Sequence, residues 1–210
     1  GAYPLRSLHL ERLQASARTL GFACGMSTLS SLLADEAARW PTGVLRVRLG
    51  LNHAGCCRVV ATPLDEDPVR EWRVTIADET LAADDYLLRH KTTARARYDR
   101  ALAALAARPE VFDVIFLNDR GEVCEGARSN IFVECNGVLL TPPLCCGLLP
   151  GVLRRELLAS GRAVERVLRL DDLRRSAVVY VGNALRGLIP VTVEPGSSRT
   201  IFATSRSGPP

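Results

Sequence analysis

The sequence predicts an α+β protein made of two subdomains. Helical periodicity and short alternating strands fill the first part of the chain, an alanine-rich helix follows, and strands dominate beyond Pro109. We expect a small α+β subdomain at residues 1–84, an Asp-rich linker at 85–89, a larger strand-rich subdomain at 90–195 and a flexible tail at 196–210. A chain of 210 residues can bury such a core without disulfides.

Two helices and three strands are expected in the small subdomain. Apolar side chains at helical spacing predict a first helix that has Ser7 as its N-cap and ends at Gly21. A second helix is expected at 27–39. Alternation of apolar and polar side chains predicts three neighbouring strands, at 44–51, 57–61 and 73–77.

The larger subdomain is expected to begin with a helix at 92–108, because alanine and leucine favour helix strongly, with Lys91 at its entrance. Asn136-Gly137 between two apolar runs predicts a hairpin, and Pro150 predicts the start of a helix at 150–158. The remaining elements are a helical turn at 171–176 and strands at 114–117, 130–134, 138–140, 164–168, 177–181 and 189–193.

Composition argues against several classes of protein. The net charge is only +4 and no block of Lys or Arg occurs, so nucleic-acid binding is not expected. Charged residues interrupt every apolar run before the ~18 residues that a membrane span needs. Seven cysteines without a Cys-x-x-Cys pattern suggest neither a disulfide framework nor a metal site, and a reducing cytoplasm fits best.

One residue stands out from the charge pattern. The 27 basic residues comprise a single lysine, Lys91, and otherwise arginine. Arginine replaces lysine wherever a solvated positive charge is wanted, but it cannot become the neutral amine that attacks a carbonyl. Two interpretations stay open on this observation alone: a coding bias that left one surface lysine by chance, or a lysine kept for its chemistry.

Four motifs follow one another along the chain, at residues 89–93 (RHKTT), 121–132 (GEVCEGARSNIF), 147–154 (GLLPGVLR) and 182–187 (GNALRG). Together they resemble the class-IV, or fold-type IV, pyridoxal-phosphate enzymes, a family with the fold of D-amino-acid aminotransferase. That family includes branched-chain and D-amino-acid aminotransferases and 4-amino-4-deoxychorismate lyase. The resemblance covers about residues 5–193, and the likeness is closest to the lyase-like domain fused behind aminodeoxychorismate synthase component I.

The resemblance implies a pyridoxal phosphate site. Lys91 would form the Schiff base and act in catalysis, and Glu125 would lie beside the ring nitrogen, whose pKa a carboxylate raises. A helix start offers free N–H groups to the phosphate. The residues expected to bind the phosphate are Arg12, Leu149, Val152, Leu153 and Asn183. Leu153 departs from the threonine that some relatives carry there, so only its backbone can serve.

The resemblance further implies a lyase reaction that converts 4-amino-4-deoxychorismate to 4-aminobenzoate and pyruvate, in the supply of folate precursor. Arg95, Arg97 and Tyr98 are candidates for substrate contacts, although residues on a helix surface need no such role. An aminotransferase acting on branched-chain or D-amino acids would use the same site residues. A domain that binds cofactor or partner subunits without turnover is the third interpretation.

Expected partners are a second copy of the chain, in a homodimer, and an upstream synthase domain of the same polypeptide. Family members carry a strand and a pocket-lining segment before the His-Leu-x-Arg-Leu helix, and neither is found ahead of residue 9. The chain also begins with Gly1 and has its only methionine at Met26. We therefore expect the N-terminal edge of the small subdomain to be missing, and a chain that accepts pyridoxal phosphate with little turnover.

Overall fold

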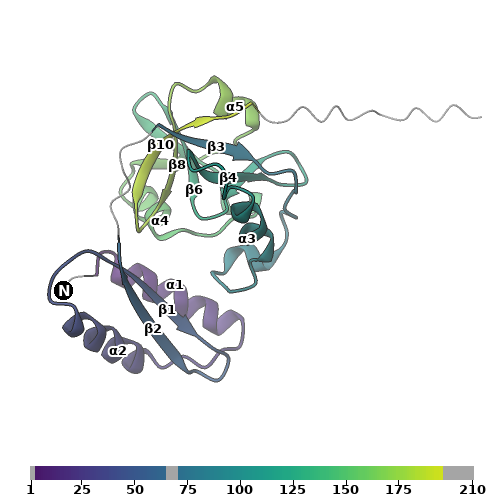
Figure 1. Cartoon of the computed structure of the whole chain (residues 1–210). Coiled ribbons are helices and arrows are strands. Elements are labelled where there is room, and N and C mark those ends of the chain that lie inside the picture. Colours follow the sequence, from purple (N-terminus) through teal and green to yellow (C-terminus); the bar gives the residue numbers. More distant parts are fainter. Residues whose placement is uncertain (1–2, 65–70, 196–210) are drawn as a thin grey trace, which may run out of the picture.

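The computed structural model describes residues 3–64 and 71–195, and within them it has two units (Figure 1). The smaller unit, in the lower half of Figure 1, packs two helices beside a two-stranded antiparallel sheet. Its elements are α1 (Arg6–Thr19), α2 (Met26–Arg39), β1 (Leu45–Leu51) and β2 (Cys57–Pro63). Its buried apolar side chains are Ala17, Leu29 and Leu33, which lie on the two helices.

The larger unit is built on a mixed eight-stranded sheet with the order β5-β4-β3-β10-β9-β6-β7-β8. Its strands are β3 (Trp72–Ile76), β4 (Val111–Leu117), β5 (Val123–Gly126), β6 (Asn130–Cys135), β7 (Val138–Thr141), β8 (Ala163–Glu165), β9 (Val179–Asn183) and β10 (Gly187–Val193). The sheet curls. Its edge strand β5 is separated from β6 by four strands in the sheet order, yet a short turn joins the two, in which the Gly126 N–H donates to the Ser129 carbonyl at 2.8 Å.

Helical segments lie between these strands. They are the 3₁₀ turns η1 (Tyr86–Arg89) and η2 (Leu144–Cys146) and the helices α3 (Ala96–Ala103), α4 (Val152–Ala159) and α5 (Leu170–Arg175). One buried cluster holds side chains of α5 and the sheet, including Leu173, Ile115 and Val181. Two smaller clusters lie under α3 and α4, around Phe116 and Phe132. No helix of the described residues is long and apolar enough to cross a bilayer.

The expectation that a strand at 73–77 pairs with the hairpin is wrong. β3 lies between β4 and β10 in the larger sheet and is parallel to both, and Val74 is fully buried in its core. Parallel partners are distant in sequence, so local alternation cannot identify them. Since Trp72–Ile76 belongs to the larger sheet, we propose that the two units divide between residues 64 and 72 instead of at residue 84.

We propose that residues 85–89, expected from the sequence to form a linker, belong to the larger unit. Their 3₁₀ turn is capped by Asp85, whose carboxylate accepts a hydrogen bond from the Leu87 N–H at 3.0 Å. Leu88 is buried in the cluster around Phe116. The segment that leads to Lys91 is therefore fixed by packing.

Two helix boundaries also differ from the prediction. Ser7 lies inside α1, whose N-cap position is Leu5 in the left-handed region at φ 54° without a side-chain cap. The helix expected at 92–108 is regular only over Ala96–Ala103. The Thr92 hydroxyl accepts a hydrogen bond from the Ala94 N–H at 3.2 Å, a local turn that competes with helix.

The hairpin around Asn136-Gly137 is confirmed. β6 and β7 pair antiparallel across these two residues, which have φ angles of 51° and 78°. Both values are those of a type I′ turn, which asparagine and glycine adopt at least cost. The tail predicted at 196–210 lies outside the described residues.

Candidate active site

Lys91 lies in an irregular segment between η1 and α3, where charged side chains of both units act on it. The neighbours are Arg95 and Glu125 from the larger unit and Arg12 and Arg48 from the smaller one. Lys91 makes no hydrogen bond or ion pair with any described residue. It is accessible to solvent and still surrounded by enough protein to be partly desolvated.

The surroundings of Lys91 lower the pKa of its amine. Partial burial contributes most, because it disfavours the charged form, and the positive charges of Arg12 and Arg95 lower the pKa further. Glu125 acts in the opposite direction. The net effect raises the fraction of neutral amine, which is the nucleophilic form.

Glu125 lies on β5 with 6% of its surface exposed. Its Oε1 accepts a hydrogen bond from the Tyr98 hydroxyl at 2.6 Å, and its Oε2 accepts one from the Leu149 N–H at 2.9 Å. Burial raises the pKa of Glu125 to about 7, although the hydrogen bonds and the charge of Lys91 act against burial. A carboxylate has about four acceptor sites, so these two donors leave room for a third.

The turn before α4 is built for close packing. The Leu149 carbonyl accepts hydrogen bonds from the Asn130 side-chain amide at 3.0 Å and from the Gly151 N–H at 2.8 Å. A Cβ on Gly151 would lie 1.9 Å from the Asn130 Oδ1, so only glycine fits there. No side chain caps α4, which leaves the N–H groups of Val152 and Leu153 as free donors at the helix start.

Arg12 carries a positive charge without a counter-charge. Its side chain forms no hydrogen bond or ion pair with the described residues, and burial lowers the pKa of its guanidinium. A partly buried cation of this kind is favourable when an anion lies beside it. Arg12 therefore fits the phosphate-binding role that the sequence predicts.

Asn183 is the last residue of β9 and lies beside the start of α4. The closeness is shown by the adjacent Gly182, where a Cβ would lie 3.0 Å from the Leu153 Cδ2. Its Oδ1 accepts hydrogen bonds from the N–H groups of Leu185 and Arg186, at 3.0 and 3.1 Å. Its Nδ2 donates to the Arg128 carbonyl at 3.2 Å. These contacts hold the turn that follows β9 and leave one Nδ2 proton for a further acceptor.

The three residues predicted as substrate contacts have partners within the protein. Arg95 pairs with Asp99 at 2.7 Å and donates to the Ala127 carbonyl at 3.0 Å. Arg97 pairs with Asp85 at 3.5 Å. Tyr98 bonds to Glu125, which places it on the carboxylate of the site.

Contacts between the two units flank the site. His90 Nδ1 lies 3.0 Å from the Ser16 Oγ, and Arg155 pairs with Glu11 at 2.6 Å. The sequence prediction did not include Arg48, whose charge acts on Lys91 from β1. The alternation of β1 sets Arg46 and Arg48 on one exposed face, but it does not show which surface this face meets.

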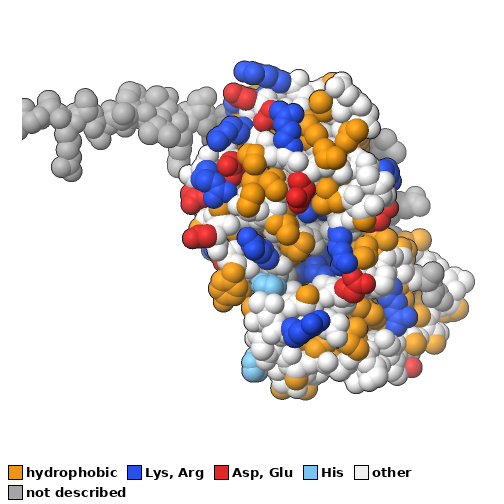
Figure 2. Space-filling model, turned by 180° about the vertical axis from the view of Figure 1, so that it is seen from behind, with side chains coloured by type: hydrophobic (Ala, Val, Ile, Leu, Met, Phe, Trp, Pro, Cys, Tyr) orange, Lys and Arg blue, Asp and Glu red, His pale blue; other side chains and the backbone are white. Residues whose placement is uncertain are grey.

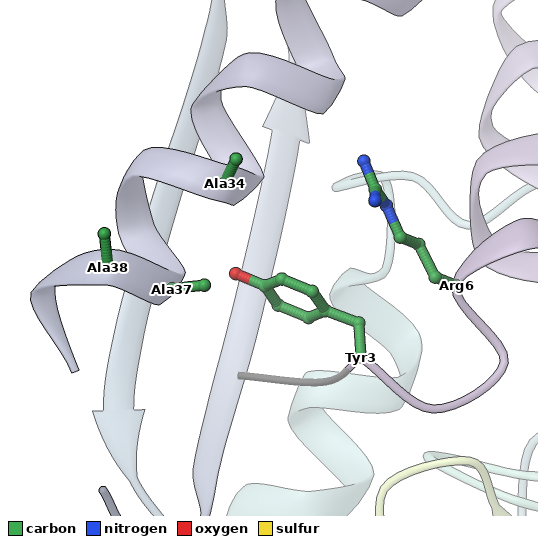
Figure 3. A pocket seen from close by; sticks show the side chains of 5 residues that line it. All are labelled: Tyr3, Arg6, Ala34, Ala37 and Ala38. Carbon is green, nitrogen blue, oxygen red and sulfur yellow. The ribbon is translucent and has the colours of Figure 1, made fainter. Parts of the chain in front are cut away.

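A hollow of about 350 Å³ lies elsewhere, between the start of α1 and α2 (Figure 3). It is lined by Tyr3, Arg6, Ala34, Ala37 and Ala38, and the Tyr3 hydroxyl donates to the Leu33 carbonyl at 2.7 Å. None of the predicted site residues lines it. It offers no amine or buried carboxylate, so the chemistry of the molecule is better sought at Lys91.

Two further features bear on ligands. Among the described residues there is no group of three or more His, Cys, Asp or Glu side chains that could hold a metal ion. On the face shown in Figure 2, Lys and Arg side chains lie among acidic and apolar ones instead of forming one basic patch.

Comparisons with known proteins agree with this geometry. The family of class IV amino-transferases matches residues 1–193. A Mesorhizobium loti structure, provisionally assigned as an amino-acid aminotransferase, is 39% identical with a TM-score of 0.86, over 92% of this chain and 93% of that one.

Two relatives known from sequence carry different activities in their names. A Schizosaccharomyces pombe protein provisionally assigned as an aminodeoxychorismate lyase is 29% identical over 85% of this chain and 79% of its own length. A Thermotoga maritima protein provisionally assigned as a branched-chain-amino-acid aminotransferase is 33% identical over a matched segment that covers 39% of this chain and 32% of that protein.

The match extends over nearly all of the described residues, and it includes every residue of the candidate site. The α+β fold predicted from the sequence is thereby confirmed as that of the fold-type IV enzymes. The chain belongs to the class IV aminotransferase family of pyridoxal-phosphate-dependent enzymes.

Proposed function

We propose that this chain is a 4-amino-4-deoxychorismate lyase, which releases 4-aminobenzoate and pyruvate, and that Lys91 is its catalytic residue. The observation that carries the proposal is the position of the only lysine of the chain, where the charges of Arg12 from the smaller unit and Glu125 from the larger unit both act on it. No other side chain of the sequence can supply the primary amine that pyridoxal phosphate requires.

The residues present fit this cofactor. The unpaired guanidinium of Arg12, the free N–H groups of Val152 and Leu153 and the remaining Nδ2 proton of Asn183 suit the phosphate. The carboxylate of Glu125 suits the ring nitrogen, because a negative charge beside that nitrogen favours its protonated form. When bound, pyridoxal phosphate withdraws electrons from the carbon that carries the substrate amine.

The proton transfers fall to Lys91. Its lowered pKa keeps a fraction of the amine neutral, so that it can take the proton from the ring carbon that carries the substrate amine. The bond between the neighbouring ring carbon and the ether oxygen then breaks, which leaves an aromatic ring, and the released enolpyruvyl group takes a proton on its methylene carbon to become pyruvate. Glu125 keeps the negative charge that balances the electron withdrawal.

The charge of the site favours the lyase over an aminotransferase for apolar amino acids. Arg12, Arg95 and Arg48 all act on Lys91, against Glu125 as the one acid among the largest influences, and Arg48 and Arg95 keep positive charge near Lys91 when Arg12 is assigned to the phosphate. Aminodeoxychorismate carries two carboxylates, whereas a branched-chain amino acid carries one. The length of the match with the lyase-named yeast relative also supports the lyase.

The second candidate is an aminotransferase for branched-chain or D-amino acids, which the names of the Mesorhizobium loti and Thermotoga maritima relatives favour. It would use the same lysine and carboxylate. We further propose a cytoplasmic homodimer that supplies a folate precursor and works with an upstream synthase domain. The seven cysteines, all free, support a reducing compartment.

The deciding experiment loads the chain with pyridoxal phosphate and adds one substrate at a time. From aminodeoxychorismate we expect 4-aminobenzoate and pyruvate in equal amounts, formed slowly because little turnover is expected of this chain, with the cofactor spectrum unchanged afterwards. Accumulation of pyridoxamine phosphate with leucine or D-alanine, without 4-aminobenzoate from aminodeoxychorismate, would establish the aminotransferase instead. Lys91→Arg, which keeps the charge and lacks the nucleophile, is the control for uncatalysed release. Cofactor binding without turnover of any of these substrates would favour the binding domain.

A further inference from the structure

Tyr98 is a half-buried hydrogen-bond donor that the reaction described above does not use. It lies in the first turn of α3, and its hydroxyl donates to the Glu125 Oε1 at 2.6 Å across 27 positions of sequence. Its ring meets Phe116 edge to face with 5.1 Å between ring centroids, and the Arg95 guanidinium carbon lies 5.6 Å from its ring centroid. These two contacts hold the ring in place and aim the hydroxyl at the carboxylate.

The second donor to this carboxylate comes from a different element. The Leu149 N–H holds the Oε2 at 2.9 Å from the turn before α4, so the two oxygens of Glu125 are fixed from two directions. One donor would leave the carboxylate free to rotate about its terminal bond. Two donors fix its plane, and the acceptor sites that remain free then have a defined direction.

We propose that Tyr98 is a positioning residue: its hydroxyl holds the Glu125 carboxylate ionised and in the orientation needed to meet the ring nitrogen of pyridoxal phosphate. The inference rests on the proposed cofactor site and revises the sequence prediction that Tyr98 contacts substrate. A hydrogen bond to a charged acceptor is stronger than one to a neutral acceptor, so the phenol favours the ionised carboxylate.

The charges around Glu125 show why such a donor matters. Burial favours the neutral acid, and Asp113 of the adjacent strand β4 acts in the same direction. The Tyr98 hydrogen bond is the largest influence that favours the carboxylate, followed by the Leu149 N–H and the charge of Lys91. Cys124, the residue before Glu125 on β5, has a pKa raised chiefly by burial and is neutral near pH 7. Without Tyr98 the balance moves toward the neutral acid.

The test uses Tyr98→Phe, which keeps the ring and its packing and removes only the hydroxyl. Tyr180→Phe is the matched control, since the half-buried Tyr180 of β9 also donates to a carboxylate, that of Glu134, at 3.1 Å. Affinities of the full chain are measured at pH 7.5 for two ligands, pyridoxal phosphate and the analogue that has carbon in place of the ring nitrogen.

We expect Tyr98→Phe to weaken binding of pyridoxal phosphate about tenfold, the effect of one charge-assisted hydrogen bond. Binding of the nitrogen-free analogue should change less than twofold, and Tyr180→Phe should leave both affinities unchanged. Equal weakening for both ligands would make Tyr98 a packing residue and overturn the proposal, as would no weakening for either. If the unmodified chain did not distinguish the two ligands, Glu125 would not meet the ring nitrogen, and the proposed cofactor placement would fall with this inference.

A second measurement needs no cofactor. The free energy of unfolding is measured against pH for Tyr98→Phe and for the double variant that also carries Glu125→Gln, and the difference between them is the contribution of Glu125. The same difference between the original chain and Glu125→Gln gives that contribution with Tyr98 intact. In Tyr98→Phe the upper end of this pH dependence, which is set by the pKa of Glu125 in the folded chain, should lie about one pH unit higher than in the chain with Tyr98 intact. An unchanged upper end would mean that the hydroxyl does not favour the carboxylate, and it would overturn the proposal whatever the ligands do.

Discussion

The buried carboxylate of Glu125 should make the stability of the cofactor-free protein fall as the pH rises. The pKa of Glu125 is about 7 in the folded chain, against an ordinary value of 4.5. Between these values the folded state binds more protons than the unfolded state, so the free energy of unfolding decreases with increasing pH. The whole shift corresponds to about 3 kcal/mol, of which about 2 kcal/mol falls between pH 5.5 and pH 8.5.

Glu125→Gln isolates this contribution. The amide keeps the shape, it can accept from the Leu149 N–H and donate to the Tyr98 oxygen, and it does not titrate. We expect the variant to gain about 2 kcal/mol of stability relative to the original chain between pH 5.5 and pH 8.5, because every other titration is common to both proteins. Urea unfolding of the cofactor-free proteins, followed by circular dichroism at several pH values, measures the difference.

Glu122→Gln provides the contrast. Hydrogen bonds from Arg120 and Asn118 lower the pKa of Glu122 to about 2, so its contribution is complete above its ordinary value of 4.5 and is lost only as the pH falls toward 2. The difference between Glu122→Gln and the original chain should therefore stay constant between pH 5.5 and pH 8.5. A constant difference for Glu125→Gln as well, or one that falls as the pH rises, would refute the assignment of a raised pKa to a buried Glu125.

Three further outcomes are expected. Lys91→Ala and Lys91→Arg should both abolish covalent attachment of pyridoxal phosphate, which is trapped by borohydride and located by mass spectrometry. The urea midpoint of the cofactor-free chain should stay unchanged. A trapped adduct in either variant would disprove the assignment of Lys91. Arg12→Met should weaken cofactor binding at least tenfold and leave stability within about 0.5 kcal/mol, because the cation has no partner to lose; Arg6→Met on the same helix should change neither. Gly151→Ala should lower the free energy of unfolding by about 2 to 3 kcal/mol, since its Cβ would lie 1.9 Å from a side-chain oxygen. Gly50→Ala, whose Cβ would have nothing nearer than 3.8 Å, should lower it by under about 0.5 kcal/mol.

Local patterns were enough to locate most elements of this fold. The helix at Met26–Arg39, the strands of the smaller unit and the Asn136-Gly137 hairpin all follow from periodicity and turn chemistry within a few residues. β3 could not be placed in this way, because its partners β4 and β10 lie far along the chain and pair with it in parallel. β5 was missed because a fully buried strand of four residues shows no alternation.

The residues of the candidate site also differ in how far local sequence could identify them. Lys91 is identifiable from composition alone, since it is the only lysine in the chain. Glu125 and the turn before α4 depended on motif spacing, and the structure brings both together through the Leu149 N–H. The partner of Tyr98 could not be foreseen, because a hydroxyl on a helix surface gives no sign of a carboxylate 27 positions away.

The proposed cofactor site is divided between two units, so cofactor affinity should depend on residues that never touch the cofactor. Arg12 belongs to the smaller unit and Glu125 to the larger, so a ligand that engages both also holds the units together. Part of its binding free energy is therefore the free energy of docking one unit on the other, in which the pairs Ser16 with His90 and Glu11 with Arg155 take part. By linkage, a mutation that loosens either pair reduces cofactor occupancy, and bound cofactor in turn protects the junction from opening.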